Sequence, residues 1–317
     1  MLFRSSRTED GYDSLSEIGS KPQIIWFLHF HKAGGNSLTT LAEVNKETKR
    51  ELGNRQGHSH FELTNEKFRW ELVDPSSPSS IPIPSSCLKE KRQSKIGKTL
   101  SFQQELRREI VNEGVTLVST EHWFPALHHD DLANILPSNV KTIVIFREPI
   151  SRLVSSYFFH DCDANRCPDT APCQFLDWIG AESNMYTRML NGQPFGPMKI
   201  GKECSLDYSK LAVNQSHLEN AKKTLTKFDL IITLDTLSKR PQFADCALRK
   251  VLGWNHTQFP HVKPPGKKKD DGKHCDNNEI KEREYLKAKK LNSLDLELYQ
   301  YAVRMESKIL SEMECFP

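Results

Sequence analysis

Residues 24–38, IIWFLHFHKAGGNSL, form the most informative stretch of the chain. An apolar run of strand length, residues 24–28, ends shortly before a Gly-Gly pair, and residues 38–46 have the spacing of a helix. The first N–H groups of a helix have no intrahelical partner, and the helix macrodipole adds positive potential at the same place. Glycine also lets an anion approach the backbone closely. The segment therefore predicts a site for a phosphate-like group.

The alternative is that the Gly-Gly pair only closes a tight connection between a strand and a helix. The segment also differs from the loop of nucleoside triphosphatases, G-x-x-x-x-G-K-[ST], in which the Lys directly precedes the hydroxyl residue. Here Lys32 precedes the glycines, and Asn36 stands directly before Ser37. The segment does not match G-x-G-x-x-G either. By itself it leaves the kind of anion open.

A second stretch, residues 140–159 (VKTIVIFREPISRLVSSYFF), repeats the strand-to-helix pattern. Its first part is β-branched and aromatic, as in a buried strand, and Pro149 suits the first turn of the following helix. Arg147 would then lie at the carboxyl end of a strand and Ser155 two turns into the helix, at the crevice where open α/β sheets bind ligands. Both side chains can donate to phosphate oxygens. The competing interpretation is that Arg147 pairs with Glu148 or caps a neighbouring helix.

Together the two segments resemble the sulfotransferases that use 3′-phosphoadenosine 5′-phosphosulfate (PAPS), and they look most like the Golgi enzymes that sulfate glycosaminoglycans at 2-O and 6-O positions. The first family motif, H-x-x-K-[TA]-G-G-x-[ST], corresponds to residues 29–37, with Ala33 in place of the commoner Thr. The second, R-[DE]-P-[IV]-x-R-x-x-S, is matched at every specified position by residues 147–155. The resemblance covers about residues 22–45 and 115–310. It implies a P-loop-like sulfotransferase fold.

The resemblance also implies a role for each motif. The first would hold the 5′-phosphosulfate of the donor, and the second would hold its 3′-phosphate through Arg147 and Ser155. Lys32 would donate to the bridging oxygen, on which negative charge grows as its bond to sulfur breaks. The implied reaction needs no metal. The residues expected to bind PAPS are Lys32, Ala33, Gly34, Gly35, Asn36, Ser37, Arg147 and Ser155.

In the family, a His after a central strand removes the proton from the acceptor hydroxyl. Residues 114–120 (GVTLVST) predict a strand, and His122 follows it. The unperturbed pKa of His, about 6.5, leaves it ready to accept a proton near pH 7. Glu121 is an alternative base or a group that orients His122, and His29 is expected to be a packed core or loop-orienting residue. The histidines that compete for the role are His29, His31, His128, His129 and His160.

Composition and patterning are consistent with a catalytic domain. The chain has 317 residues, 37% of them hydrophobic and 27% charged, and its net charge of +3 does not argue for nucleic acid. Residues 1–20 are expected to be disordered, and residues 21–317 to form a sulfotransferase catalytic domain with an insertion at about 50–100. Alternating strands and helices predict an α/β fold with a central, mainly parallel sheet flanked by helices.

Several further elements are expected. Residues 184–190 (NMYTRML) predict a surface helix with one buried Met and one buried Leu, although the resemblance also allows Tyr186 and Arg188 to approach the donor or acceptor. Residues 228–234 predict a strand that ends in a small polar turn at 234–236. The other predicted helices span residues 102–112, 211–226, 242–252 and 285–310.

Two basic loops, residues 89–98 and 263–273, bear on the acceptor. The simpler interpretation is that both are solvated, flexible loops. If the acceptor is a polyanionic polysaccharide, either loop could form part of its track, and the second could instead touch the 3′-phosphate. The acceptor is therefore expected to be a glycan or another hydroxyl compound, with its identity left open.

Eight Cys residues are many for a cytosolic protein. Disulfides in an oxidising lumen explain them better than zinc, because the cysteines do not form two closely spaced pairs. The longest apolar run, residues 24–28, is far shorter than the ~20 residues of a membrane-spanning helix. The expectation is a Golgi luminal or membrane enzyme whose anchor is not visible in this sequence, with a soluble cytoplasmic form as the alternative. Asn214 and Asn255 begin glycosylation sequons, compatible with a lumen but also expected by chance.

Two other functions compete with sulfuryl transfer. A P-loop kinase-like phosphotransferase would need a Lys next to Ser37, which is absent, and an acidic Mg²⁺ ligand, for which Asp235 is the only fair candidate. A non-catalytic glycan-binding relative would keep the fold and the basic loops without needing the donor-binding and catalytic residues. The sequence favours the sulfotransferase because it retains Lys32, His122, Arg147 and Ser155 together.

Overall fold

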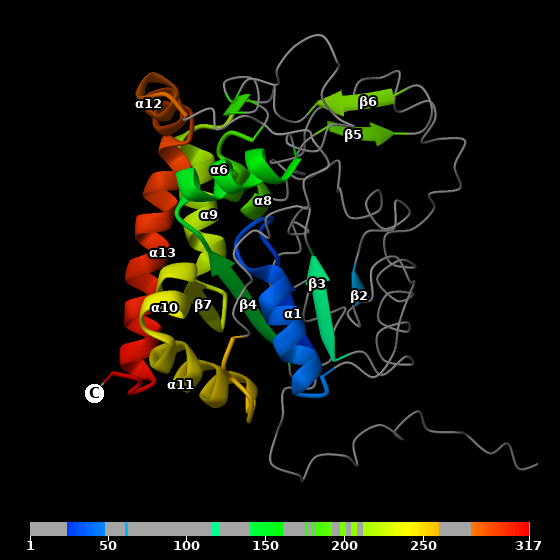
Figure 1. Ribbon diagram of the computed structural model, residues 1–317, viewed down its shortest axis with the longest axis vertical. Helices are drawn as coiled ribbons and strands as arrows, with labels where there is room; N and C mark the ends of the chain where they lie inside the picture. The colour runs from blue at the N-terminus through cyan, green and yellow to red at the C-terminus, as the bar shows by residue number, and fades with distance from the viewer. Residues whose placement is uncertain are drawn as a thin grey trace, which may run out of the picture.

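The protein is described by a computed structural model, which covers residues 24–47, 61–62, 116–120, 140–160, 175, 179–180, 182–191, 197–200, 204–207, 212–259 and 280–316. These residues form an α/β fold around a five-stranded parallel sheet in the order β2-β3-β1-β4-β7 (Figure 1). Its strands are β1 (Ile24–Leu28), β2 (Phe61–Glu62), β3 (Leu117–Thr120), β4 (Val140–Phe146) and β7 (Leu230–Thr233).

Helices cover both faces of the sheet, and a short antiparallel pair of strands stands apart from it. The pair consists of β5 (Pro197–Ile200) and β6 (Cys204–Asp207), which the sequence analysis did not predict. The helices are α1 (Gly35–Val44), α6 (Pro149–His160), α8 (Met185–Leu190), α9 (Gln215–Leu225), α10 (Leu234–Lys239), α11 (Pro241–Leu252), α12 (Glu282–Leu291) and α13 (Ser293–Glu312).

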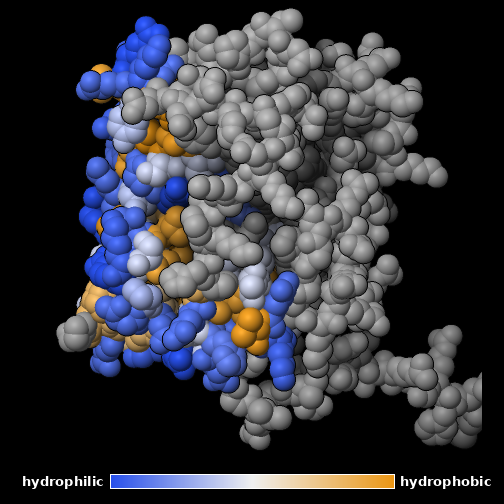
Figure 2. All heavy atoms as spheres, in the orientation of Figure 1, coloured by the Kyte–Doolittle hydropathy of each residue, from blue (hydrophilic) through white to orange (hydrophobic). Residues whose placement is uncertain are grey.

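The central strand β1 is buried on both faces, which explains its unbroken apolar sequence. Trp26 packs in the core that α8, α9 and α13 share with the sheet. Phe27, the next residue along the strand, packs in the core on the opposite face, with α1 and α11. Hydrophilic residues dominate the outer edge of the molecule where α12 and α13 lie (Figure 2). The predicted architecture of a parallel sheet between two helical layers is confirmed.

The order of the strands places a topological switch point between β1 and β4. The chain leaves β1 through α1 toward β2, beyond β3 on one side, whereas it leaves β4 through α6 toward β7 on the other side. The connections that follow the two strands therefore diverge, and open α/β sheets bind ligands in the crevice at such a point. The strand arrowheads point to the end of the sheet where α6 and α8 lie (Figure 1). The two sequence motifs begin at this end.

Three local predictions were wrong. The helix predicted at 285–310 is two helices, because the chain breaks at buried Asn292, whose Oδ1 accepts from the backbone N–H of Asn184 (3.0 Å). The turn predicted after β7 is the start of α10, which Thr233 caps by accepting from the N–H of Thr236 (3.2 Å). The surface helix predicted at 184–190 is α8, and all six of its residues are buried.

Other predictions fall on parts of the chain that lie outside the described residues. These are the N-terminal segment 1–20, the helix at 102–112 and both basic loops. Within the expected insertion, the structure describes β2, which pairs with β3 at the edge of the sheet. The insertion therefore contributes a strand to the central sheet.

A disulfide joins Cys246 of α11 to Cys315, which follows α13 (Cα–Cα 5.6 Å). It ties the C-terminal segment to the helical layer that also contains α1. The sequence could not identify this pair, because the two cysteines are 69 residues apart.

Glu306 of α13 meets the end of β7. Its carboxylate accepts from the N–H of Thr233 (2.7 Å) and from the Thr233 hydroxyl (2.9 Å). Burial raises the pKa of Glu306 above its ordinary value, although these hydrogen bonds act in the opposite direction. Folding therefore favours the protonated form of this carboxyl group.

The contribution of Glu306 to stability is consequently expected to fall as pH rises. It is complete below the pKa of Glu in an unfolded chain, about 4.3, and is lost as pH rises through the higher folded value. Urea unfolding between about pH 4 and pH 8 should show that the wild type loses free energy of unfolding relative to Glu306→Gln as pH increases. A wild-type advantage that grows with pH would contradict the raised pKa.

Candidate anion-binding site

The turn after β1 has an unusual backbone. Lys32 and Gly34 both lie in the left-handed region, with φ of 63° and 96°. Positive φ is uncommon for a residue other than glycine, and such conformations cluster at functional sites. At Gly34 an added Cβ would also lie 3.3 Å from Cδ1 of Leu234, the first residue of α10. The dihedral angle therefore favours glycine at this position, and a side chain here would also crowd the segment after β7.

Helix α1 begins directly after this turn. The carbonyl of Gly34 accepts from the N–H groups of Ser37 (3.1 Å) and Leu38 (3.3 Å), so Gly35 and Asn36 precede the first of these helical bonds. The first turn of α1 contains no acidic residue that would offset the positive end of the macrodipole. The Ser37 amide is engaged within the helix. The backbone at Gly35 and Asn36 is thus the part of this turn best suited to an anion.

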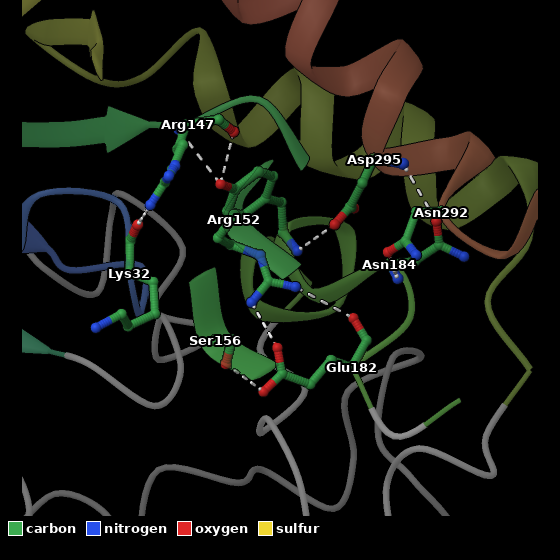
Figure 3. A network of polar contacts seen from close by, with 9 residues as sticks. Lys32, Arg147, Arg152, Ser156, Glu182, Asn184, Asn292 and Asp295 are labelled. Atoms are coloured by element: carbon green, nitrogen blue, oxygen red, sulfur yellow. Dashed lines mark hydrogen bonds and ion pairs between the residues drawn. The ribbon is translucent and has the colours of Figure 1, made fainter. Parts of the chain in front are cut away.

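Arg147 joins the second motif to the first. It follows β4 directly, and its Nη1 donates to the backbone carbonyl of Lys32 (3.3 Å). The Lys32 side chain extends away from this contact (Figure 3). The two motifs, 115 residues apart in sequence, therefore meet at the switch point between β1 and β4. Their meeting brings a guanidinium and an ammonium group to the end of the sheet where the parallel strands have their carboxyl ends.

The expected alternative of an Arg147–Glu148 pair is not the arrangement in the structure. Both carboxylate oxygens of Glu148 accept from the start of α6, at the N–H groups of Ile150 (3.1 Å) and Ser151 (2.6 Å). Burial lowers the pKa of Arg147 from its ordinary value, but an Arg side chain stays protonated at any physiological pH. Arg147 therefore contributes positive charge in a partly desolvated position.

A buried ion pair lies beside this site. Arg152 of α6 donates to Glu182 (2.7 Å), and the hydroxyl of Ser156, one turn later, donates to the other carboxylate oxygen (2.8 Å; Figure 3). Both partners of the pair are almost inaccessible, with side-chain exposures of 1% and 2%. Ser155, the motif residue, is half-buried beside Ser156 on the same helix. Glu182 could not be identified from the sequence, because no local pattern marks it.

Of the two candidate residues on α8, Tyr186 reaches the second motif. Its hydroxyl donates to the backbone carbonyl of Arg147 (2.8 Å) and lies 3.3 Å from the Arg147 N–H, which donates to it. Arg188 instead donates through Nε to the carbonyl of Ser183 (3.0 Å). Tyr186 therefore acts on the backbone that carries the Arg147 guanidinium.

Helix α8 is in turn fixed by the start of α13. The carboxylate of Asp295 accepts from the backbone N–H groups of Tyr186 (2.9 Å) and Thr187 (2.8 Å) and from the Thr187 hydroxyl (2.8 Å). The neighbouring Asn184 and Asn292 also hydrogen-bond across the same junction (Figure 3). A continuous set of contacts thus runs from α13 through α8 to Arg147 and the glycine turn.

The expected base, His122, lies outside the described residues, as does its neighbour Glu121. β3 ends at Thr120, which pairs with Leu28 at the end of β1, so the chain leaves β3 at the edge where the glycine turn begins. His29 is buried and stacks on Phe27 with ring centroids 5.5 Å apart, which confirms the expectation of a packed residue. In the described part of the chain, no three His, Cys, Asp or Glu side chains are grouped to hold a metal ion.

A search of protein-family models and of curated proteins finds no match to this chain. Among the described helices, none is both long enough and apolar enough to cross a membrane.

Proposed function

We propose that this protein is a PAPS-dependent sulfotransferase that transfers a sulfuryl group to a hydroxyl of a carbohydrate acceptor. The observation that carries the proposal is the contact between the two motifs, in which Arg147 donates to the carbonyl of Lys32 (3.3 Å). A ligand at this end of the sheet would meet both the start of α1 and the Arg147 guanidinium. Two anion-binding groups at one site suit a nucleotide with phosphates on both its 5′ and 3′ positions.

In the proposed arrangement, backbone amides at the start of α1 hold the 5′-phosphate of the donor, and Arg147 with Ser155 holds the 3′-phosphate. PAPS supplies the sulfuryl group. The acceptor oxygen forms a bond to sulfur as the bond from sulfur to the phosphate oxygen breaks, and adenosine 3′,5′-bisphosphate leaves. Lys32 donates to that phosphate oxygen, and His122 takes the proton from the acceptor hydroxyl. The protein thus contributes positioning and charge stabilisation, as in phosphoryl transfer.

The acceptor and the compartment are also part of the proposal. A glycan acceptor follows from the resemblance of the two motifs to the glycosaminoglycan sulfotransferases. The disulfide between Cys246 and Cys315 is compatible with a luminal, oxidising compartment such as the Golgi. A polyanionic polysaccharide would be attracted by the basic loops of the sequence.

Binding of adenosine 3′,5′-bisphosphate, measured by calorimetry, tests the donor site. Arg147→Ala is expected to weaken this binding about 10- to 100-fold, because a hydrogen bond to a charged group contributes roughly 1.5–3 kcal/mol. Arg249→Ala is a suitable control, since Arg249 is exposed on α11 and pairs with Asp245 (3.2 Å). Its affinity for the nucleotide should equal that of the wild type.

The same experiment separates the alternative functions. A phosphotransferase would prefer ATP with Mg²⁺ over adenosine 3′,5′-bisphosphate, and a glycan-binding relative would bind neither nucleotide tightly. Unchanged affinity of Arg147→Ala for the bisphosphate would remove Arg147 from the donor site.

A further inference from the structure

Tyr186 is a buried side chain that contacts both halves of the candidate site without belonging to either motif. Its ring packs against Phe30, in the turn after β1, with centroids 4.4 Å apart, and against Phe146, the last residue of β4, at 5.0 Å. Its hydroxyl engages both backbone polar groups of Arg147. One side chain thus touches the two segments whose relative position defines the site.

We propose that Tyr186 is a positioning residue for Arg147, fixing the peptide from which its guanidinium reaches toward the glycine turn. The inference rests on the proposed function, because it assigns to Tyr186 an effect on the 3′-phosphate half of the donor site. Arg147 lies just beyond the end of β4, where the ladder of the sheet no longer sets the direction of the backbone. The Tyr186 hydroxyl takes over that task by pairing with the N–H and the C=O of the same residue.

The position of Tyr186 is itself determined from three sides. Asp295 accepts from its backbone N–H (2.9 Å), and the Arg152 guanidinium lies 5.7 Å from its ring centroid, a cation–π distance. Glu182 holds Arg152 in turn through the buried ion pair (2.7 Å). The hydroxyl therefore has little freedom to follow Arg147 if that backbone moves.

The hydrogen bond from the Tyr186 hydroxyl to the Arg147 carbonyl is also expected to be insensitive to pH. Burial raises the pKa of Tyr186 above its ordinary value, so the hydroxyl keeps its proton throughout the range in which enzymes work. It can then donate to the Arg147 carbonyl at every such pH. A pH dependence of donor binding would have to arise from other groups.

Tyr186→Phe tests the inference because it removes the hydroxyl and keeps the ring. We expect the dissociation constant of adenosine 3′,5′-bisphosphate to rise about tenfold, while that of adenosine 5′-monophosphate, which lacks the 3′-phosphate, changes by less than about twofold. At saturating donor, kcat should stay within about twofold of the wild type, since Tyr186 touches no reacting atom. Tyr301→Phe, a change on α13 beside Lys222, is the matched control.

A double-mutant cycle separates positioning from general loss of structure. If Tyr186 acts through Arg147, Tyr186→Phe should add less than about twofold to the effect of Arg147→Ala on bisphosphate binding. Equal weakening of both nucleotides by Tyr186→Phe, or a full tenfold effect in the Arg147→Ala background, would overturn the inference. If Tyr186→Phe does not fold, Asp295→Asn, which loosens α8 from α13, should give the same difference between the two nucleotides.

The outcomes also distinguish this inference from the proposed function. A wild-type protein that binds no adenosine 3′,5′-bisphosphate would contradict the proposed function itself. A wild type that binds it, with Arg147→Ala weakened and Tyr186→Phe unchanged, would contradict only the role of Tyr186.

Discussion

Replacement of His122 by alanine is expected to lower kcat by about 10²–10⁴-fold, the usual loss when a general base is removed. Affinity for adenosine 3′,5′-bisphosphate should stay the same, because the base is proposed to act on the acceptor and not on the donor. The wild-type kcat/KM is expected to rise with pH through about 6.5 as His122 loses its proton, and the variant should lack this limb. Steady-state rates and calorimetry on the same preparations measure both effects.

His256→Ala provides the control for a histidine that the mechanism does not use. The side chain of Asn45, just beyond the end of α1, donates to the His256 backbone carbonyl (2.6 Å), which places His256 away from the glycine turn at the start of that helix. Its kcat should match the wild type. Normal turnover by His122→Ala would instead transfer the role of base to Glu121 or to another histidine.

Glu182→Ala is expected to destabilise the fold by about 3–5 kcal/mol, because it leaves the Arg152 guanidinium buried without its counter-charge. The Ser156 hydroxyl would lose its acceptor in the same change. Urea unfolding monitored by circular dichroism would report the loss as a lower midpoint. The effect is large because the side chains of Arg152 and Glu182 are only 1% and 2% exposed.

Glu297→Ala is the matched control for this prediction. Glu297 is an exposed residue of α13 whose carboxylate accepts from Lys222 (2.7 Å), and an exposed ion pair contributes only about 0–1 kcal/mol. Similar losses of unfolding free energy in Glu182→Ala and Glu297→Ala would contradict this prediction, because the buried ion pair would then contribute no more to stability than the exposed one.

Both segments of the candidate site could be predicted from sequence because each is local. In residues 24–38 and 140–159, an apolar strand, a turn residue and a helix start follow one another directly, and the boundaries of β1, the end of β4 and the start of α6 agree with that pattern. The meeting of the two segments could be expected from the rule that parallel strands present their carboxyl ends at one edge.

The contacts that support the site could not be predicted, because they join distant parts of the chain. Glu182 is 30 residues from Arg152, and Asp295 is 109 residues from Tyr186. Helix α8 resembles a surface helix because its sequence includes Thr187 and Arg188, but a long-range hydrogen bond from Thr187 to Asp295 and a local one from Arg188 to Ser183 allow both residues to be buried. Local composition carries no signal for such partners.

The break between α12 and α13 also depends on a contact between distant parts of the chain. Residues 285–310 have continuous helical spacing, and Asn292 is tolerated within many helices. Here its side chain accepts from the Asn184 backbone, and the chain restarts as a new helix whose first turn presents Asp295 to α8. A tertiary contact therefore overrides the local pattern at the point where it supports the site.

The proposal of sulfuryl transfer is tested most directly by incubating the purified protein with PAPS that carries labelled sulfate and with a panel of glycans, phenols and steroids. We predict transfer of label to at least one glycan, with release of adenosine 3′,5′-bisphosphate, and loss of that transfer in His122→Ala. Absence of transfer to every acceptor, together with no binding of the bisphosphate, would contradict the assignment.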